Sequence, residues 1–522
     1  TLDTAEDFEV IKTLLEYLKS INREFDYDMD DIFNFFKNNP EVLNINKPIN
    51  QKAAPITVNT EINWQNFTKL PLVTVYITSY NYDRFIKESI DSVIKQKFRD
   101  FEVIIIDDGS TDNSKQIIEQ YRNHPKVTII YQENKGLNIT NNIAIKLAKG
   151  KYIMRLDADD YLNENALTVM SQKLNCDDSL ALVFPDYYLI DVSGNIVTEE
   201  KRHDFKNVTM YDQPAHGACT MIRKDVLIEL EGYSEEFTRQ DGYELWIKVI
   251  KNKKVANIDL ALFYYRQHGN NLTSNKEKLY NTRYEIVKKH TQELDIKSMN
   301  HIAIIPLRDD DDDSMALKKF ADTTLLDITI KSLLLSENIK KIIITTPNEK
   351  IISYLENKYK DTVIIDKRPI ELARVNTHMD DTVKYVVSQY NLDDIDSISI
   401  VNYEHPLRKN FYIDNAINTL YLFDADSIIS VSQENSNFYV HEGNGLQSFN
   451  TNSELRLERD FIYKETGGLH VVKADSFMKL GKIVGDRVTH IVLDEKSAKS
   501  INSKQDFEYL EYLYKKDLSE SF

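Results

Sequence analysis

The sequence predicts an α/β protein with two open, largely parallel sheets behind a helical N-terminal extension. Short runs of β-branched residues alternate with apolar residues at helical spacing, first from residue 72 and again from residue 302. The length of 522 residues also exceeds what a single hydrophobic core usually fills. We therefore expect a helical extension and linker at residues 1–65, and α/β domains at residues 66–298 and 299–522.

The N-terminal segment has the pattern of two amphipathic helices. Apolar residues recur at spacings of three and four in its first part, at Phe8, Ile11, Leu15 and Leu18. A shorter stretch of the same kind surrounds Phe33, and the polar run 44–60 has the turn chemistry of a linker. The apolar stripe is equally compatible with oligomerisation, with docking to another protein, and with packing on the following domain.

The first alternation predicts a parallel sheet with ligand-binding strand ends. The predicted strands are residues 72–78, 101–106, 127–131 and 152–156, and a helical stripe from Ile86 to Ile94 separates the first two. The second strand runs into Asp107, Asp108 and Gly109, where carboxylates can hydrogen-bond a nucleoside. In open sheets of this type, ligands bind beyond the carboxyl ends of the strands.

The fourth strand runs into Asp157, Ala158, Asp159 and Asp160, a pattern in which alternate carboxylates can share Mg²⁺ or Mn²⁺. A metal would hold a diphosphate that this acidic chain would otherwise repel, since 83 acidic against 65 basic residues give a net charge of −18. The same charge argues against nucleic acid as a partner.

The remaining composition favours an ordinary globular chain of a reducing compartment. Two cysteines cannot form a disulfide framework, and no apolar run reaches the roughly 20 residues that span a bilayer. We expect no transmembrane segment, and a cytoplasmic location that allows peripheral contact with the inner face of the membrane.

Three segments in order resemble the nucleotide-diphospho-sugar transferase (GT-A, Rossmann-like) fold, and specifically glycosyltransferase family 2, over about residues 70–275. The segments are residues 73–81, 107–112 and 157–160. The resemblance implies that Thr78, Tyr80 and Asp108 contact the nucleoside. It also implies that Asp157 and Asp159 contact ribose, diphosphate and a divalent metal.

Two later segments extend the resemblance. Residues 238–246 resemble the family's catalytic-base segment, which implies that Asp241 takes the acceptor proton; a helix N-cap is the structural alternative for this residue. Residues 264–268 resemble an Arg-x-His segment that closes the donor site, which implies a metal or diphosphate contact for His268 with support from Arg266, near Ser274. Residues 216–223 resemble the acceptor-side strand and loop.

The second α/β domain more weakly resembles the cytidylyltransferases that activate acidic nine-carbon sugars. The resemblance rests on residues 302–308, 368–373, 405–408 and 425–431. Two departures put activity in doubt: Asp309 to Asp313 replace a phosphate-cradling loop, and Ser500 to Asn502 replace a metal-binding Asp-x-Asp. We expect a nucleotidyltransferase-like domain that has lost transfer and serves in binding, docking or assembly, unless the carboxylates collect a cation that restores triphosphate binding.

Together these features predict an inverting, metal-dependent glycosyltransferase with Mn²⁺ or Mg²⁺ as cofactor. The donor is a nucleoside-diphosphate sugar, with UDP favoured by the resemblance, and the acceptor is a glycan or glycoconjugate of a surface polysaccharide. An active bifunctional glycosyltransferase/cytidylyltransferase and a non-catalytic nucleotide-sugar-binding scaffold are the alternatives. A homo-oligomer is compatible with the sequence.

Overall fold

The computed structural model describes most of the chain, which divides into two units, residues 1–68 and 69–522. The described residues are 5–45 without 22, 24–26 and 28, then 70–201, 217–237, 241–268, 276–308, 315–374, 376–390, 395–434, 436, 438–441, 443, 445–448 and 462–520. The side chains of residues 5–7, 29, 43, 241, 276–278, 448 and 520 are outside the description. Within these ranges, no helix has both the length and the apolar character needed to cross a membrane.

The first unit is a small helical module, as the apolar spacing predicts. It contains α1 (Ala5–Ser20), α2 (Met29–Asn38) and the short 3₁₀ turn Val42–Asn44. Val10, Phe35 and Val42 form its core, and the rings of Tyr17 and Phe35 lie 5.0 Å apart. The predicted stripe is only partly buried: Leu18 is fully buried, but Phe8, Ile11 and Leu15 are exposed because α2 covers one face of α1.

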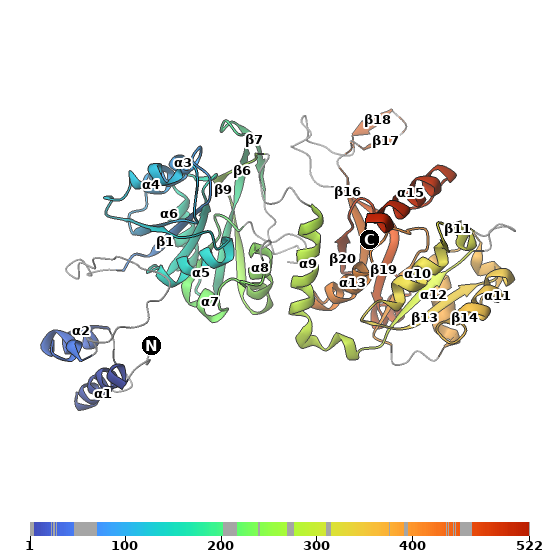
Figure 1. Cartoon of the computed structure of the whole chain (residues 1–522), viewed down its shortest axis with the longest axis horizontal. Coiled ribbons are helices and arrows are strands. Elements are labelled where there is room, and N and C mark those ends of the chain that lie inside the picture. The colour runs from blue at the N-terminus through green and yellow to red at the C-terminus, as the bar shows by residue number, and fades with distance from the viewer. Residues whose placement is uncertain are drawn as a thin grey trace. The chain divides into compact units, whose positions relative to one another are not determined.

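The second unit begins with a nine-stranded mixed sheet, in which the four neighbouring strands β3, β2, β1 and β4 are parallel and β8 is antiparallel to both of its neighbours (Figure 1). The strand order is β3-β2-β1-β4-β8-β6-β9-β5, with β7 paired to β6. The strands are β1 (Val73–Ser79), β2 (Phe101–Asp107), β3 (Val127–Tyr131), β4 (Tyr152–Asp157), β5 (Tyr161–Leu162), β6 (Leu180–Ile190), β7 (Ile196–Glu200), β8 (Met221–Arg223) and β9 (Lys254–Arg266). The four predicted strands are confirmed, and β1 lies between β2 and β4.

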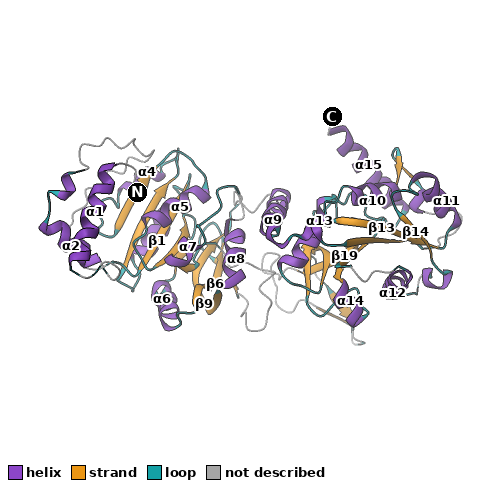
Figure 2. Cartoon of the chain, turned by 90° about the horizontal axis from the view of Figure 1, so that it is seen from below, coloured by secondary structure: helices purple, strands orange, loops and turns teal. Residues whose placement is uncertain are grey.

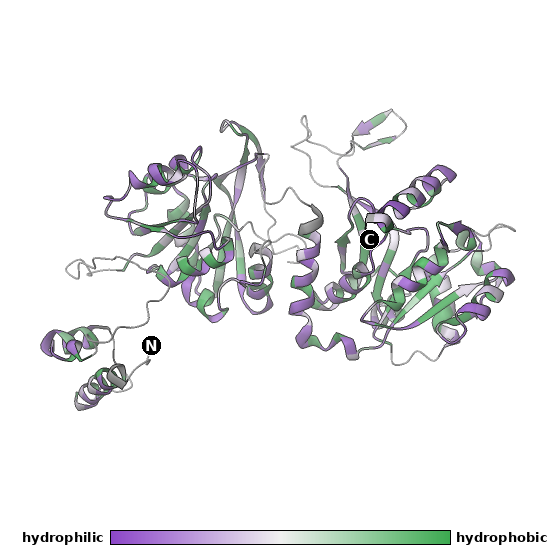
Figure 3. Cartoon of the chain, viewed as in Figure 1, coloured by the Kyte–Doolittle hydropathy of each residue, from purple (hydrophilic) through white to green (hydrophobic). Residues whose placement is uncertain are grey.

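Helices cover both faces of this sheet (Figure 2). One face packs on α3 (Ile86–Ile94), α4 (Ser114–Glu119) and α6 (Ala166–Cys176). The other packs on α5 (Leu137–Leu147), α7 (Lys224–Glu229) and α8 (Asp241–Asn252). Because both faces are covered, β1 and β2 are buried on both sides along most of their length, and Figure 3 shows largely hydrophobic strands here.

A second, seven-stranded sheet follows in the order β14-β13-β10-β15-β19-β16-β20. Its strands are β10 (His301–Pro306), β13 (Ile339–Thr346), β14 (Ile364–Lys367), β15 (Ser397–Val401), β16 (Ser427–Glu434), β19 (Ile462–Lys473) and β20 (Val488–Val492). Two small hairpins, β11 (Lys319–Phe320) with β12 (Thr323–Thr324) and β17 (Tyr439–His441) with β18 (Leu446–Ser448), stand apart from it. The second α/β alternation predicted from the sequence is therefore present.

The helices of the second sheet also lie on two faces. One face packs on α10 (Leu325–Leu334), α11 (Glu349–Lys358), α13 (Phe411–Leu422) and α15 (Lys504–Glu520). The opposite face packs on α12 (Met379–Gln389) and α14 (Ala474–Leu480). Helix α9 (Lys276–His290) contributes Ile286 and Val287 to a small core shared with Phe423, which follows α13.

Gly150 marks the tightest backbone approach at the start of β4. A Cβ atom there would lie 2.4 Å from the backbone nitrogen of Thr74, and the Gly150 N–H donates to Thr74 Oγ1 at 2.8 Å. We expect Gly150→Ala to lower the free energy of unfolding by about 1–3 kcal/mol, since the neighbouring atoms are backbone and cannot rotate away. Urea denaturation measures the change.

The neighbouring exposed Lys149 provides the matched control. Lys149→Ala keeps the backbone N–H that donates to Glu102, so we expect a change within about 0.5 kcal/mol. If Gly150→Ala is as mild as this control, the close approach of β1 and β4 at Gly150 is wrong.

Candidate active site

The carboxyl ends of β1, β2 and β4 meet at one edge of the first sheet. The register pairs Thr78 with Asp157 across β1 and β4, and Ser79 with Asp107 across β1 and β2. Chain order also reverses here, because β2 and β3 lie on one side of β1 and β4 on the other. Such reversal points are where open α/β sheets bind ligands, so the predicted residues Thr78 and Asp157 lie at the expected position.

Two loops at this edge are tied together by side-chain hydrogen bonds. Asn81, which has a positive φ of 62°, accepts from the Thr111 N–H at 2.8 Å, and its own N–H donates to Ser110 Oγ at 2.9 Å. Gly109 has φ +82°, and a Cβ there would lie 2.8 Å from the backbone nitrogen of Asn134. The loop that carries the exposed Tyr80 is therefore held against the Asp-Asp-Gly-Ser turn.

Asp108 is buried and organises the loop that follows β3. Its carboxylate accepts from Gln132 Nε2 at 2.7 Å and from the backbone N–H groups of Lys135 and Gly136 at 2.8 and 2.9 Å. These bonds engage both oxygens within the protein. A direct contact of Asp108 with the nucleoside stays a prediction, whereas its support of the loop 132–136 is visible.

Asp157 is paired with a buried arginine on the same strand. Arg155 Nε lies 2.8 Å from Asp157 Oδ1, and Nη2 donates to Oδ2 at 3.3 Å. The two residues are separated by one position on β4, so their side chains project from the same face. The Arg155 guanidinium neutralises the first carboxylate of the Asp-x-Asp pattern, which leaves the second for other partners.

The second carboxylate, Asp159, faces His268 from the end of β9. Asp159 Oδ2 and His268 Nε2 lie 2.8 Å apart, and their side chains are only 9% and 12% exposed. The His268 ring stacks on Phe85 with centroids 5.7 Å apart. The fold thus joins two predicted metal-ligating residues that are 109 positions apart in sequence.

Arg266 holds the backbone around this pair. Its guanidinium, 2% exposed, contacts Glu88 Oε2 at 2.5 Å and donates to the carbonyls of Asp159, Asp191 and Val192 at 2.9, 3.2 and 3.2 Å. It therefore links α3, the Asp-x-Asp turn and the β6–β7 connection. The predicted support of this site by Arg266 acts through the backbone of Asp159 and through Glu88.

Asp160 and Tyr82 lie in the negative field of this turn. Asp160 is completely buried, and burial together with Asp159 and Asp157 raises its pKa well above the usual range, while the Arg266 N–H donates to Oδ1 at 2.9 Å. Burial and the same carboxylates also raise the pKa of the Tyr82 hydroxyl. A cation bound at Asp159 would relieve this concentration of negative charge.

Asp241 is the first residue of α8, and three residues on Glu244 is buried. Burial opposes ionisation of Glu244, but bonds with His290 at 3.2 Å and Lys248 at 3.1 Å hold its pKa below the usual value. Glu244 thus ties α8 to α9 in a structural role. The assignment of Asp241 as catalytic base stays a prediction. Ser274 and the first residue of the predicted acceptor-side segment, His216, lie outside the described residues.

The donor set at Asp159 and His268 fits a divalent cation that a diphosphate helps to coordinate. In the described part of the chain, no three His, Cys, Asp or Glu side chains gather closely enough to form an all-protein metal site. Asp157 is engaged by Arg155, so the predicted three-residue set reduces to one oxygen and one nitrogen donor. Mg²⁺ commonly binds through one or two side chains plus substrate phosphates and water, which suits this arrangement.

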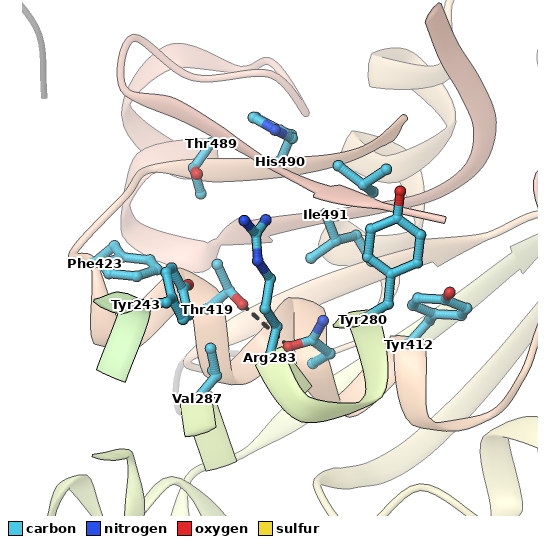
Figure 4. Close-up of a pocket in the computed structure, with 12 residues that line it drawn as sticks. Tyr243, Tyr280, Arg283, Val287, Tyr412, Thr419, Phe423, Thr489, His490 and Ile491 are labelled. Atoms are coloured by element: carbon cyan, nitrogen blue, oxygen red, sulfur yellow. Dashed lines mark hydrogen bonds between the residues drawn. The ribbon is translucent and has the colours of Figure 1, made fainter. Parts of the chain in front are cut away.

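Two hollows elsewhere do not suit the donor. The pocket in Figure 4 lies between α8, α9, α13 and β20, has a volume of about 50 Å³, and includes Tyr243, Arg283 and His490. A larger one of about 530 Å³ lies at the amino ends of β1 and β4, beside Gly150 and Ile228. The first is below the roughly 300 Å³ of small-molecule sites, and the second is at the sheet edge opposite Asp157.

The chain matches the family model "Glycosyl transferase family 2" over residues 74–230. It is 29% identical to an Escherichia coli chondroitin synthase over 246 residues, 46% of this chain and 36% of that protein. It is 32% identical over 233 residues to an uncharacterised glycosyltransferase of Methanocaldococcus jannaschii, covering 42% of this chain and 79% of that protein.

A third relative carries a more specific name. An E. coli UDP-Glc:alpha-D-GlcNAc-diphosphoundecaprenol beta-1,3-glucosyltransferase is 29% identical over 222 residues, 40% of this chain and 82% of that protein. The chain thus spans little more than a third of the chondroitin synthase but most of two other relatives.

Removing the Arg266 guanidinium should destabilise the protein strongly. Arg266→Met leaves three carbonyls and Glu88 without their donor, and we expect the free energy of unfolding to fall by about 3–5 kcal/mol. Urea denaturation followed by circular dichroism measures it.

An exposed arginine pair serves as the control for this substitution. Arg122 and Glu119 lie 2.5 Å apart with side chains 52% and 38% exposed, so Arg122→Met should cost less than about 1 kcal/mol. Equal effects of the two substitutions would refute the anchoring role of Arg266.

Proposed function

Because the chain belongs to glycosyltransferase family 2, we propose that its first α/β domain transfers a sugar from a nucleoside-diphosphate donor to a glycan or glycoconjugate acceptor. The observation that carries the proposal is the Asp159–His268 pair at the reversal point of the sheet, beside an Asp157 held by Arg155. This pair supplies a metal-compatible contact for a diphosphate at the edge where the nucleoside would lie.

The proposed reaction is a single displacement at the anomeric carbon. The acceptor hydroxyl oxygen forms a new bond to the anomeric carbon while the bond between that carbon and the diphosphate oxygen breaks. The configuration at the anomeric carbon therefore inverts. Asp241 takes the hydroxyl proton at its carboxylate. Mn²⁺ or Mg²⁺ at Asp159 and His268 would supply positive charge to the departing nucleoside diphosphate.

Thr78, Tyr80 and Asp157 are proposed to position the nucleoside and ribose. Thr78 lies directly across from Asp157 in the β1–β4 register, and the loop of Tyr80 is fixed by Asn81. Asp108 is proposed to contribute by shaping the adjoining loop 132–136. Thr78 and Asp157 lie at the carboxyl edge of the sheet, and this shared edge supports the proposal that one nucleotide contacts both.

UDP is the proposed nucleotide, and surface polysaccharide synthesis the proposed process. Support comes from the name of the E. coli glucosyltransferase, which specifies UDP-Glc and a diphosphoundecaprenol-linked acceptor, and from the chondroitin synthase. We further propose that the second α/β domain is a cytidylyltransferase-like frame without nucleotidyl transfer. The run Asp309 to Asp313 that motivates this idea lies outside the described residues.

Loss of the Asp159 carboxylate should abolish metal-assisted donor binding. With UDP-sugars and Mn²⁺ at about 100 times Kd, the wild-type protein should gain about 2.7 kcal/mol of stability, seen as a higher melting temperature. Asp159→Ala should lose most of this gain. A screen of UDP-, GDP- and CDP-sugars with and without Mn²⁺ also tests the choice of nucleotide.

Asp426→Ala is the matched control, because Asp424 and Asp426 repeat the Asp-Ala-Asp pattern in the second sheet but pair with Arg487. It should retain the donor response. The absence of any nucleotide-sugar response in the wild-type protein would contradict the proposal, and binding without turnover would favour a scaffold.

Replacing the proposed base should separate binding from chemistry. Asp241→Asn should retain donor binding while the rate of transfer falls by roughly 10²–10⁴-fold, since no carboxylate is left to take the proton from the hydroxyl of the sugar acceptor. Sugar transfer to glycan acceptors measures the rate. Glu244→Gln should instead lower the free energy of unfolding by weakening the bond to His290, and should leave kcat largely intact. If Asp241→Asn transfers sugar at the wild-type rate, Asp241 is not the catalytic base.

A further inference from the structure

Helix α9 lies between the two sheet domains in the chain and packs on the second. Lys288 Nζ lies 2.7 Å from Oε1 of Glu337, a residue between α10 and β13. The ring centres of Tyr284 and of Phe411, the first residue of α13, are 5.2 Å apart. Phe423, which follows α13, shares a small buried core with α9. These contacts fix α9 on the second sheet domain.

The same helix contacts α8, which begins at Asp241. Tyr243, in the first turn of α8, belongs to the same buried core as Ile286 and Val287 of α9. The guanidinium carbon of Arg283 on α9 lies 5.0 Å from the centre of the Tyr243 ring, within the range of a cation–π attraction. Figure 4 shows Tyr243, Arg283 and Val287 at this contact. The first turn of α8, which carries the proposed base, therefore packs on α9.

Lys289, in the last turn of α9, holds the loop 234–237, which precedes α8 in the chain. Its Nζ donates to Ser234 Oγ at 3.0 Å and to Glu236 Oε2 at 2.6 Å. The same Nζ lies 5.1 Å from the centre of the Phe237 ring. One ammonium group thus contacts a hydroxyl, a carboxylate and an aromatic face within four consecutive residues.

A second helix anchors the same loop from within the first sheet domain. Asn138 on α5 is buried, and its Nδ2 donates to the carbonyls of Ser234 and Phe237 at 2.7 and 2.6 Å. The loop 234–237 is therefore fixed between α5 and α9. Residues 238–240 lie outside the described residues, and both segments that flank them, the loop and α8, contact α9.

The contacts of Lys289 matter more for position than for stability. The side chains of Lys289 and Glu236 are 38% and 64% exposed, and an ion pair this accessible contributes little to the free energy of unfolding. The rate of transfer is more sensitive, because a displacement of about 1 Å in an active site can lower a rate by about 100-fold. The loss of Lys289 should therefore affect transfer more than folding.

We propose that α9, packed on the second sheet domain, positions Asp241 for sugar transfer, and that Lys289 is the positioning residue. This inference rests on the proposed function, in which Asp241 takes the proton of the acceptor hydroxyl. Lys289 holds the loop before Asp241, and Arg283 holds Tyr243 in the turn that Asp241 begins. The second sheet domain thereby takes part in transfer through α9, whatever ligand it binds itself.

The test measures transfer by the full chain with Mn²⁺ and the UDP-, GDP- or CDP-sugar that most stabilises the wild-type protein. Lys289→Met removes the ammonium group, and we expect kcat to fall by about 10- to 100-fold. The dissociation constant of the nucleotide sugar should stay unchanged, since the proposed donor site lies at the ends of β1, β4 and β9. Lys289→Arg keeps a cation for Glu236 and Phe237 and should restore most of the rate.

Lys251→Met is the matched control, because it removes an ion pair at the other end of α8. Lys251 Nζ lies 2.8 Å from Glu293 Oε2, and the two side chains are 48% and 79% exposed. We expect its kcat to stay within about twofold of the wild-type value. Glu236→Gln removes the charge that Lys289 meets and serves if Lys289→Met does not fold; its kcat should fall by about 3- to 10-fold.

A double-mutant cycle separates positioning from a general structural effect. Because Lys289 acts through Asp241, Lys289→Met should lower the residual rate of Asp241→Asn by less than about twofold. An equal fall in both backgrounds, or a wild-type kcat in the folded Lys289→Met and Glu236→Gln variants, overturns the inference and leaves sugar transfer itself in place. No transfer by the wild-type protein would instead contradict the proposed function, and this inference with it.

Discussion

Charge buried at the carboxyl ends of parallel strands needs a counter-charge, and this constraint decides which side chains remain for a ligand. In the first sheet, Arg155 engages Asp157 and Arg266 engages Glu88 together with the backbone of the Asp-x-Asp turn. What remains is Asp159 facing His268 at 2.8 Å. The internal ion pairs therefore define the site as much as the groups that face the ligand.

The alternation of strands and helices and the motifs at the strand ends could be predicted from the sequence, because the spacing of apolar residues and the choice of turn residues are local properties. The Arg155–Asp157 pair was also accessible in principle, since residues two apart on a strand share a face. The Arg266–Glu88 pair was not, because the two residues are 178 positions apart and nothing local links them. For the same reason, only the tertiary structure reveals that Phe8, Ile11 and Leu15 of α1 are exposed and that Asp108 holds the loop 132–136.

The two sheets share a plan and differ in the charged side chains that they bury. Each has a block of four parallel strands in which the chain order reverses, between β1 and β4 in one sheet and between β10 and β15 in the other. The first edge concentrates carboxylates at the end of β4, which suits a cation. Among the described residues of the second domain, Arg368 and Arg408 are buried and bond to backbone carbonyls.

The two cysteines differ in solvent exposure, so thiol modification can report on the packing of the first sheet. Cys176 is exposed at the end of α6, whereas Cys219 is buried and its N–H donates to the carbonyl of Arg155 at 2.7 Å. Burial raises the pKa of the Cys219 thiol well above the usual range, which further slows its alkylation. After Cys176 is blocked, the rate at which a thiol reagent modifies Cys219 reports how often the segment around Cys219 separates from β4, the strand that ends in Asp157.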